Sequence, residues 1–442
     1  MAKKRVRLTL EEKLELSERI SLVNINDRFS TYPSKGLTPE KLAALLREAD
    51  QGDIYRQMEL FEEILEKDGH VMSLFGNIRL SVCGKNYEIT TESEDELDKE
   101  IAKDAAKMLA KVKSWYNFVG NILDCAPKAI SLQELKWEVN GDRIDFVGYK
   151  FINPKNLRCG KISDYQSDLS EIRLVIDPQN VEAFRGIVPD DQLKIAHTDG
   201  VALDCSPMFR KRFALAIAQL RSGTPARAAL LRTIAYLYMF KNYDIKWWVR
   251  FAEIQLGIRL GKFDPSQPEQ LAILKKAIAN LGNDSAAVIS KDSEIEFKEL
   301  LQKAATFETY KELKDFCNAE MTKAILLHTA AVESTPGKLG NEETALDALQ
   351  NLLEFYAKIV DEVITDDVLR PWVEMNYGVR ETYPQYHTQI QKGIDLIKHA
   401  NLLKLLQSIG LTLSKKYVVQ KFGIPAYNPN DLDDEALSPS QL

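Results

Sequence analysis

The histidines and cysteines, the side chains best suited to hold a metal or act as nucleophiles, are few and scattered. The chain has five of each: His70, His197, His328, His387, His399, Cys83, Cys125, Cys159, Cys205 and Cys317. No two of them form the CxxC or HExxH spacings on which zinc sites and metalloproteases depend. We therefore expect no metal site and no cofactor, and we expect reduced, mostly buried thiols.

One short segment resembles a phosphate-binding loop but lacks its chemistry. Gly257–Phe263 reads GIRLGKF, with three residues between the glycines instead of four. Phe263 stands where a Ser or Thr would have to bind Mg²⁺. The chain also has no GxGxxG fingerprint after a predicted strand and no GxSxG elbow. Since no pair of carboxylates stands out as an acid and a base, the sequence predicts a protein that is not an enzyme.

The totals describe an ordinary globular chain. It has 442 residues, 45% of them hydrophobic, and a net charge of −7. This length suits two or three structural units, and the charge argues against a basic nucleic-acid binder as a whole. No apolar run reaches the ~20 residues that span a bilayer, and the N-terminus has no apolar signal-peptide core. We expect no membrane association and assembly in the cytoplasm.

Charge is segregated along the chain. Residues 207–262 hold eleven basic and two acidic residues, whereas residues 342–374 hold nine acidic and two basic ones. The basic stretch is also rich in aromatic residues. Packing in the protein core, with arginine side chains extended toward solvent, explains these aromatic residues better than a platform on which nucleic-acid bases stack. The acidic stretch is either a solvated helix face or a wall lining something that must not adhere to it.

Periodicity predicts a predominantly helical α+β fold. The acidic stretch is a long amphipathic helix that should end at Pro371, because proline cannot donate to the helix ladder. A break with two prolines is expected at 257–270. Further helices are predicted at 38–50, 53–80, 94–113, 115–127, 225–256, 269–281, 302–327, 386–408 and 413–421. Strands are predicted at 85–90, 135–140, 143–152, 171–177 and 193–198, with a strand pair at 286–300.

Four segments together resemble the portal proteins of Mu-like tailed phages and prophages. They are GLTPEKLAALLREADQGDIYRQMELFEEILEKDGHVMSLFGNIRLSV, FKNYDIKWWVRFAEIQLGIRLGKFD, LGNDSAAVISKDSEIEF, and the pair MTKAILLHTA and GNEETALDALQNLLEFYAKIVDEVI with PWVEMNYG. The resemblance covers residues 36–380 in the expected order. Relatives commonly read LGQTLTT-like where this chain has Leu327–Ala331.

The resemblance implies a portal fold built from a wing, a stem, a clip, a channel and a crown. It implies a ring, usually of twelve subunits, at one vertex of the capsid, through which double-stranded DNA enters and leaves. On this chain the parts would be an N-terminal arm (1–36), the wing (37–206), a basic stem helix region (207–256), the clip (257–300), a second stem helix (301–327), the channel loop (328–340), a long acidic helix (341–372), the crown (373–428) and an acidic tail (429–442).

The implied site residues fall in three groups. The channel loop would bring His328, Thr329, Glu333, Ser334, Thr335, Gly337 and Lys338 near DNA. The acidic helix would present Glu343, Asp347, Glu354 and Asp361, which repel the phosphates and keep the duplex centred. The clip would offer Arg259 and Lys262 to partners.

The implied partners are those of a particle component. They are other copies of the chain, DNA, the large terminase subunit, the major capsid protein and its scaffold, and the head-completion and tail connector proteins. The implied location is the portal vertex of a virion assembled in a bacterial cytoplasm. Two alternatives remain: a helical scaffold or adaptor of the phage head and, less favoured, a nuclease or motor subunit.

Overall fold

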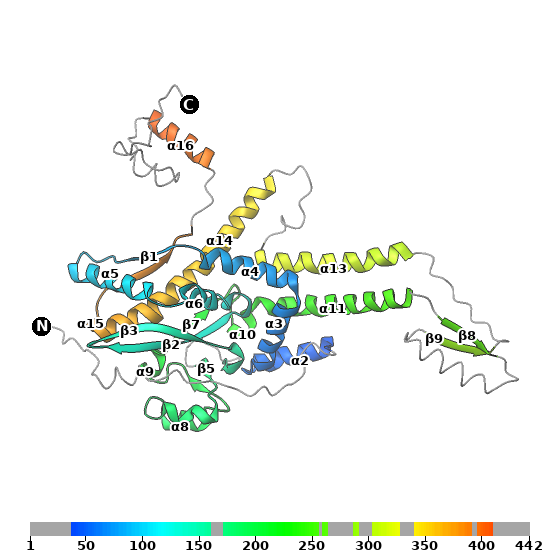
Figure 1. Cartoon of the computed structure of the whole chain (residues 1–442), viewed down its shortest axis with the longest axis horizontal. Coiled ribbons are helices and arrows are strands. Elements are labelled where there is room, and N and C mark those ends of the chain that lie inside the picture. Colours follow the sequence, from blue (N-terminus) through cyan, green and yellow to red (C-terminus); the bar gives the residue numbers. More distant parts are fainter. Residues whose placement is uncertain are drawn as a thin grey trace. The chain divides into compact units, whose positions relative to one another are not determined.

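The computed structural model of the chain (Figure 1) describes residues 37–160, 171–255, 259–263, 286–290, 303–327, 340–390 and 396–409. The chain divides into two units, Met1–Gln389 and Ile390–Leu442. Within the described ranges, no helix is both long enough and apolar enough to cross a membrane. The predicted arm, the helices at 269–281 and 413–421, and the tail lie outside these ranges.

Helices make up the N-terminal part of the first unit. Thr38 caps the first helix by accepting a hydrogen bond from Lys41 N, and Pro39 follows in the first turn, as predicted. The predicted run at 53–80 is two helices, because Asp68 is extended and its carboxylate caps the second. The bounds are α2 (Pro39–Asp50), α3 (Tyr55–Lys67), α4 (Gly69–Cys83), α5 (Glu96–Ala110), α6 (Trp115–Ile122) and α7 (Cys125–Lys128).

A three-stranded antiparallel sheet, in the order β3-β2-β7, supports the long helices. Its strands are β2 (Ile130–Asn140), β3 (Arg143–Ile152) and β7 (Phe213–Ile217). The first two form the predicted hairpin, and Gly141 turns it with a φ of 64°. Trp137 is fully buried in this sheet at a shift of register. Helices α14 and α15, bounded below, contact β7 and β3 respectively.

A second small sheet corrects two strand predictions. Strands β4 (Leu157–Arg158), β5 (Arg173–Leu174) and β6 (Val201–Ala202) pair in that order, so only the centre of the predicted strand 171–177 forms. The predicted strand at 193–198 is wrong. Its first half belongs to helix α8 (Asp190–Ile195), which starts after Pro189 and whose first turn carries two aspartates, and its second half lies in the turn that follows. The connecting elements are η1 (Pro154–Asn156), η3 (Pro178–Phe184) and α9 (Pro207–Arg210).

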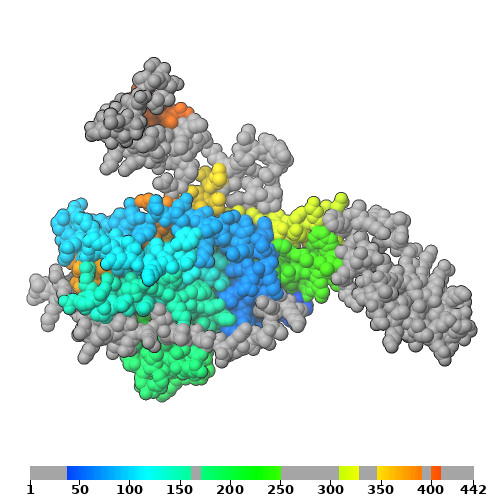
Figure 2. Space-filling model, in the orientation of Figure 1, coloured from blue at the N-terminus to red at the C-terminus, as the bar shows by residue number. Residues whose placement is uncertain are grey.

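The predicted helix at 225–256 is two helices rather than one. Ala229 has a ψ of 125°, so α10 (Pro225–Ala228) ends before α11 (Leu230–Gln255) begins. Helix α13 (Lys303–Leu326) forms as predicted and lies alongside α11 (Figure 1). Figure 2 shows the two helices, green and yellow, next to the blue surface of the N-terminal helices.

The predicted break at 257–270 contains a strand. β8 (Arg259–Phe263) pairs in parallel with β9 (Ala286–Ser290), which is the first part of the predicted strand pair at 286–300. The second part of that pair lies outside the described residues.

The acidic helix does not end at Pro371, and that prediction is wrong. α14 (Gly340–Val363) passes through a π-helical turn, η4 (Ile364–Leu369), into α15 (Arg370–Tyr377). Pro371 lies in the first turn of α15, directly after the widened turn, where its missing N–H is tolerated. Gly378, with a φ of 81°, ends the helix.

A two-stranded antiparallel sheet joins distant parts of the first unit. β1 (Tyr87–Thr90), predicted at 85–90, pairs with β10 (Gln385–Thr388). The predicted helix at 386–408 is therefore wrong in its first part. Its remainder is α16 (Leu396–Ser408) in the second unit. The predominantly helical α+β class is confirmed.

Candidate functional site

The second half of the acidic helix is anchored in the body of the first unit. Asp367, in η4, accepts a hydrogen bond from Arg210 Nη2 at 2.5 Å and another from Leu215 N at 2.9 Å. The carboxyl is 8% exposed, and this burial raises the pKa of Asp367 although the Arg210 charge opposes the shift. One buried carboxylate therefore ties the π-helical turn to α9 and β7.

Asp361, one of the predicted acidic channel residues, takes part in a similar anchor. Its Oδ1 accepts hydrogen bonds from Thr388 N at 2.9 Å and Thr388 Oγ1 at 2.6 Å. Burial raises the pKa of Asp361, and the bonds from Thr388 partly offset it. Thr365 accepts from Tyr386 N one turn later. These two side chains hold β10 against the helix, so the Asp361 carboxylate serves the fold.

The far end of the helix binds the hairpin and the basic segment. Asn376 Oδ1 accepts from Ile144 N, and its Nδ2 donates to the carbonyls of Ile144 and Trp372, each at 2.8 Å. Glu374 lies 3.0 Å from Lys211 Nζ. Together with the contact between Arg210 and Asp367, this pair joins the acidic and basic stretches within one chain. Some of the opposite charges on those two stretches are thus paired within one chain, without a neighbouring subunit.

The first half of α14 differs from the second in exposure. None of the residues from 346 to 351 is buried, whereas Leu352, Tyr356 and Val360 belong to the core. Asp347 is exposed, and Glu354 is half-buried and accepts a hydrogen bond from Gln350. Leu346 is 67% exposed on the same part of the helix. Glu343 lies in the first turn of α14.

Most of the other predicted site residues lie outside the described part of the chain. The channel-loop residues, His328, Thr329, Glu333, Ser334, Thr335, Gly337 and Lys338, lie outside the described residues. Arg259 and Lys262 lie on β8, paired with Ala286 and Ile289. Of the three predicted groups, only the acidic helix has side chains among the described residues, and all three groups stay predictions.

A buried polar cluster that sequence reasoning missed lies where α4, α11 and α13 meet. Lys241 Nζ is 2.9 and 2.8 Å from the two oxygens of Asp68 and 2.7 Å from Asn318 Oδ1. His70 Nε2 lies 3.0 Å from Asn318 O and 2.8 Å from Thr322 Oγ1. The sequence offered one signal, since Lys241 falls on the apolar stripe of α11. Its spacing cannot identify the partners, which come from other helices.

The α11–α13 pair also exposes large apolar side chains. Tyr236, Phe240 and Trp247 follow one face of α11, with 37%, 48% and 56% of their surfaces exposed, and Phe316 on α13 is 58% exposed. Neighbouring positions such as Tyr238 and Met239 are buried. The prediction that the aromatics of this helix serve packing is therefore correct for only part of them. An exposed apolar face of this kind typically marks a protein interface.

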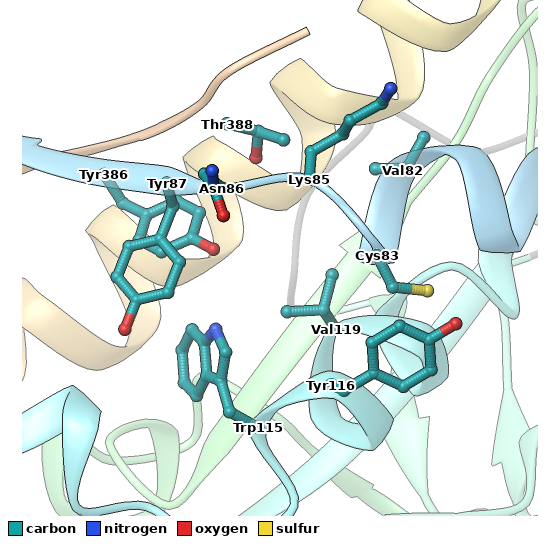
Figure 3. Close-up of a pocket in the computed structure, with 10 residues that line it drawn as sticks. All are labelled: Val82, Cys83, Lys85, Asn86, Tyr87, Trp115, Tyr116, Val119, Tyr386 and Thr388. Atoms are coloured by element: carbon teal, nitrogen blue, oxygen red, sulfur yellow. The ribbon is translucent and has the colours of Figure 1, made fainter. Parts of the chain in front are cut away.

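A small aromatic hollow lies between β1 and α6 (Figure 3). Tyr87 and Tyr386 stack with ring centroids 4.8 Å apart, and Trp115 lies 5.8 Å from Tyr87. Cys83 and Val119 line the opposite side. Burial raises the pKa of the Cys83 thiol, so the group is not a poised nucleophile.

The described cysteines are free thiols, four of them buried, as predicted. Burial raises the pKa of Cys159 to about 12 and that of Cys205 to about 11. Within the described ranges, no three His, Cys, Asp or Glu side chains gather in a way that could hold a metal ion.

Comparison with known proteins identifies the family. The family model described as "Portal protein of Mu bacteriophage" matches residues 58–424. The Mu-like prophage FluMu protein gp29 of Haemophilus influenzae is 23% identical over 95% of this chain and 77% of its own length. The portal protein of Escherichia phage Mu is 24% identical over 71% of this chain and 56% of its own length.

Two solved structures are also similar to this chain. One is the neck of an empty gene transfer agent particle (TM-score 0.44, 10% identity, covering 88% of this chain and 94% of that one). The other is the virion of a native gene transfer agent particle (TM-score 0.45, 9% identity, covering 94% and 99%). The family match covers far more than half of the sequence, and the chain belongs to the portal proteins of Mu-like bacteriophages.

Proposed function

We propose that twelve copies of this chain close into a ring at one vertex of a phage capsid, and that double-stranded DNA passes through its centre. The ring would be assembled in the bacterial cytoplasm. It would meet the major capsid protein and scaffold, then the large terminase subunit, and later the head-completion and tail connector proteins. Its role is that of a conduit and docking platform, without catalysis.

The observation that carries this proposal is the contrast between the two halves of the acidic helix. Its second half is fixed by Asp361, Asp367 and Asn376 to two sheets and to the basic segment. Its first half has no buried residue from 346 to 351 and presents Asp347 to solvent. A rigidly held helix with an exposed acidic end suits the wall of a channel, because repeated negative charge around a ring repels the DNA phosphates.

We propose the following assignment of the portal parts to the described elements. Helices α2–α7 and the sheets around β2 and β5 would form the wing, and α11 with α13 the stem. The exposed aromatic face of α11 supports this placement, since a closed ring needs two different faces of each subunit to pack together. The pair β8–β9 would belong to the clip, with Arg259 and Lys262 facing partners. The crown, expected at 373–428, would instead begin near Ile390, where the second unit starts, because α15 and β10 belong to the first unit.

The test is a charge reversal in the wall of the proposed channel. Asp347→Lys combined with Glu354→Lys is introduced into the phage or prophage that carries the gene, and packaged DNA and ring assembly are measured together. We expect rings to form while packaged DNA falls by about tenfold, because new lysines bind phosphates by counterion release. Asp199→Lys combined with Asp204→Lys, the same double charge reversal at two exposed turn residues, is the matched control. Normal packaging by the double variant would contradict the acidic-wall role.

A further inference from the structure

The outer edge of β1 carries backbone groups that no described residue uses. Gln389 N donates to Asn86 O at 2.8 Å, which fixes the alternation of the ladder between β1 and β10. Glu88 and Thr90 therefore bond across to β10, and the N–H and C=O groups of Tyr87 and Ile89 point outward. Helix α5 contacts β1, but in the described part of the chain no hydrogen bond reaches those outward groups.

The outward amides of the sheet's other edge are both bonded. Those of Tyr386 and Thr388 donate to Thr365 and Asp361 on the acidic helix. The outward amides are thus paired along β10, whereas those along β1 have no partner among the described residues. A sheet edge of this kind accepts an added strand through main-chain hydrogen bonds.

The side chains of β1 specify what such a strand should look like. Tyr87 and Ile89 are half-buried on the inner face, whereas Glu88 and Thr90 are exposed on the outer face. Beneath the inner face lies the hollow of Figure 3, about 250 Å³ in volume and lined by Trp115 and Val119. This volume is below the usual range of small-molecule pockets and suits an inserted apolar side chain. A matching strand would alternate apolar residues inward with polar or basic residues outward.

The surroundings of this edge are mostly acidic, although the base Lys85 is exposed just before β1 and lines the hollow. Glu88 is exposed, with one oxygen 3.2 Å from Gln389 Nε2, and Glu92 is exposed just after the strand. Glu94 and Glu96 share Lys99, so these two acids have one base between them. A basic partner strand would gain cross-strand ion pairs here.

We propose that the N-terminal segment Arg5–Leu10 of this chain adds to the free edge of β1 as a third strand. Its sequence, RVRLTL, alternates Val6, Leu8 and Leu10 with Arg5, Arg7 and Thr9. The aliphatic residues would face Tyr87 and the hollow, and the arginines would lie beside Glu88. The 26 residues between Leu10 and Leu37 span up to about 85 Å when extended, at ~3.3 Å per residue, which gives the segment a long reach from α2. This inference is independent of the ring and of DNA passage.

Hydrogen–deuterium exchange of the full-length protein tests the added strand. The amides of Tyr87 and Ile89 are compared between the complete chain and a variant that lacks residues 2–10. We expect at least about tenfold slower exchange at these two amides in the complete chain, with Glu88 and Thr90 little changed, because only the outward amides gain partners. Equal exchange at Tyr87 and Ile89 in both proteins would overturn the proposal, whether or not the shortened chain also loses affinity for DNA.

Two further comparisons test the face and the charge. Leu8→Ser should remove the protection of Tyr87 and Ile89, whereas its neighbour Thr9→Ser should keep it. Arg7→Glu should also reduce the protection, and Arg7→Glu combined with Glu88→Arg should restore it. If neither Leu8→Ser nor Arg7→Glu changes the protection of Tyr87 and Ile89, the result would contradict a specific third strand.

Discussion

Arg210 and Asp367 lie 2.5 Å apart and join the basic and acidic stretches of one chain. Asp367 is almost fully buried, so removing its carboxylate leaves the Arg210 charge and the Leu215 amide without their acceptor. We expect Asp367→Ala to lower the free energy of unfolding by about 3–5 kcal/mol. Urea unfolding followed by tryptophan fluorescence measures it.

The control for this prediction is the adjacent residue. Asp366 pairs with Arg370 at 3.4 Å, and both side chains are about half exposed. Asp366→Ala should therefore cost no more than about 1 kcal/mol. Equal losses in the two variants would show that the contact between Arg210 and Asp367 does not anchor the helix.

Asp244 should make stability depend on pH. Its carboxyl is buried on α11, its Oδ2 has no hydrogen-bond partner among the described residues, and burial raises the pKa of Asp244 above 3.8. A carboxyl whose pKa is raised on folding destabilises the folded state by an amount that grows as the pH rises from the unfolded pKa to the folded pKa and is complete above the folded pKa. We expect Asp244→Asn to have a higher melting temperature at pH 8, with the advantage shrinking as the pH falls toward 4. An advantage that does not vary with pH would exclude titration of Asp244 as the cause.

Asn376 should require its amide. Its Nδ2 donates to two backbone carbonyls. A carboxylate in its place would put an acceptor oxygen against these two carbonyl oxygens. We expect Asn376→Asp to cost at least about 2 kcal/mol of unfolding free energy. The exposed Asn351→Asp makes the same chemical change on α14 and should be nearly neutral. Thermal unfolding of both variants at pH 7 measures the difference.

The polar cluster at Lys241 should hold α11 and α13 against α4. Lys241→Met leaves the buried Asp68 without its opposite charge, which we expect to cost about 3 kcal/mol. Amide exchange should accelerate in both α11 and α13. The exposed Lys246→Met on the same helix is the control and should change neither quantity. Unchanged exchange in α13 after loss of Lys241 would contradict the proposed link.

The sequence predicted those parts of the fold that depend on local patterns. The hairpin around Gly141 and the cap at Thr38 follow from turn chemistry and capping, which act within a few residues. The pairing of β1 with β10 depends on a contact between distant parts of the chain, so the short strand near Tyr386 was mistaken for a helix. The helix end at Pro371 was wrong for a similar reason, because tertiary anchors at Asp367 stabilise a π-helical turn that compensates for the proline.

In the candidate site, too, local patterns could be predicted from the sequence, whereas contacts between distant segments could not. Charge counting located the acidic helix, but it treated Asp347 and Asp361 alike. Only their surroundings separate them, since Asp347 is exposed and Asp361 is bonded to Thr388. Likewise, Lys241 was counted as one of several bases, although its partners Asp68 and Asn318 come from distant segments.

The central claim is that this chain closes into a ring around DNA. Its most direct test is electron microscopy of the purified full-length protein, with native mass measurement on the same sample. We expect closed rings with a central hole and the mass of twelve 50.2 kDa chains. A protein that stays a monomer or dimer, or forms open filaments without a hole, would contradict it.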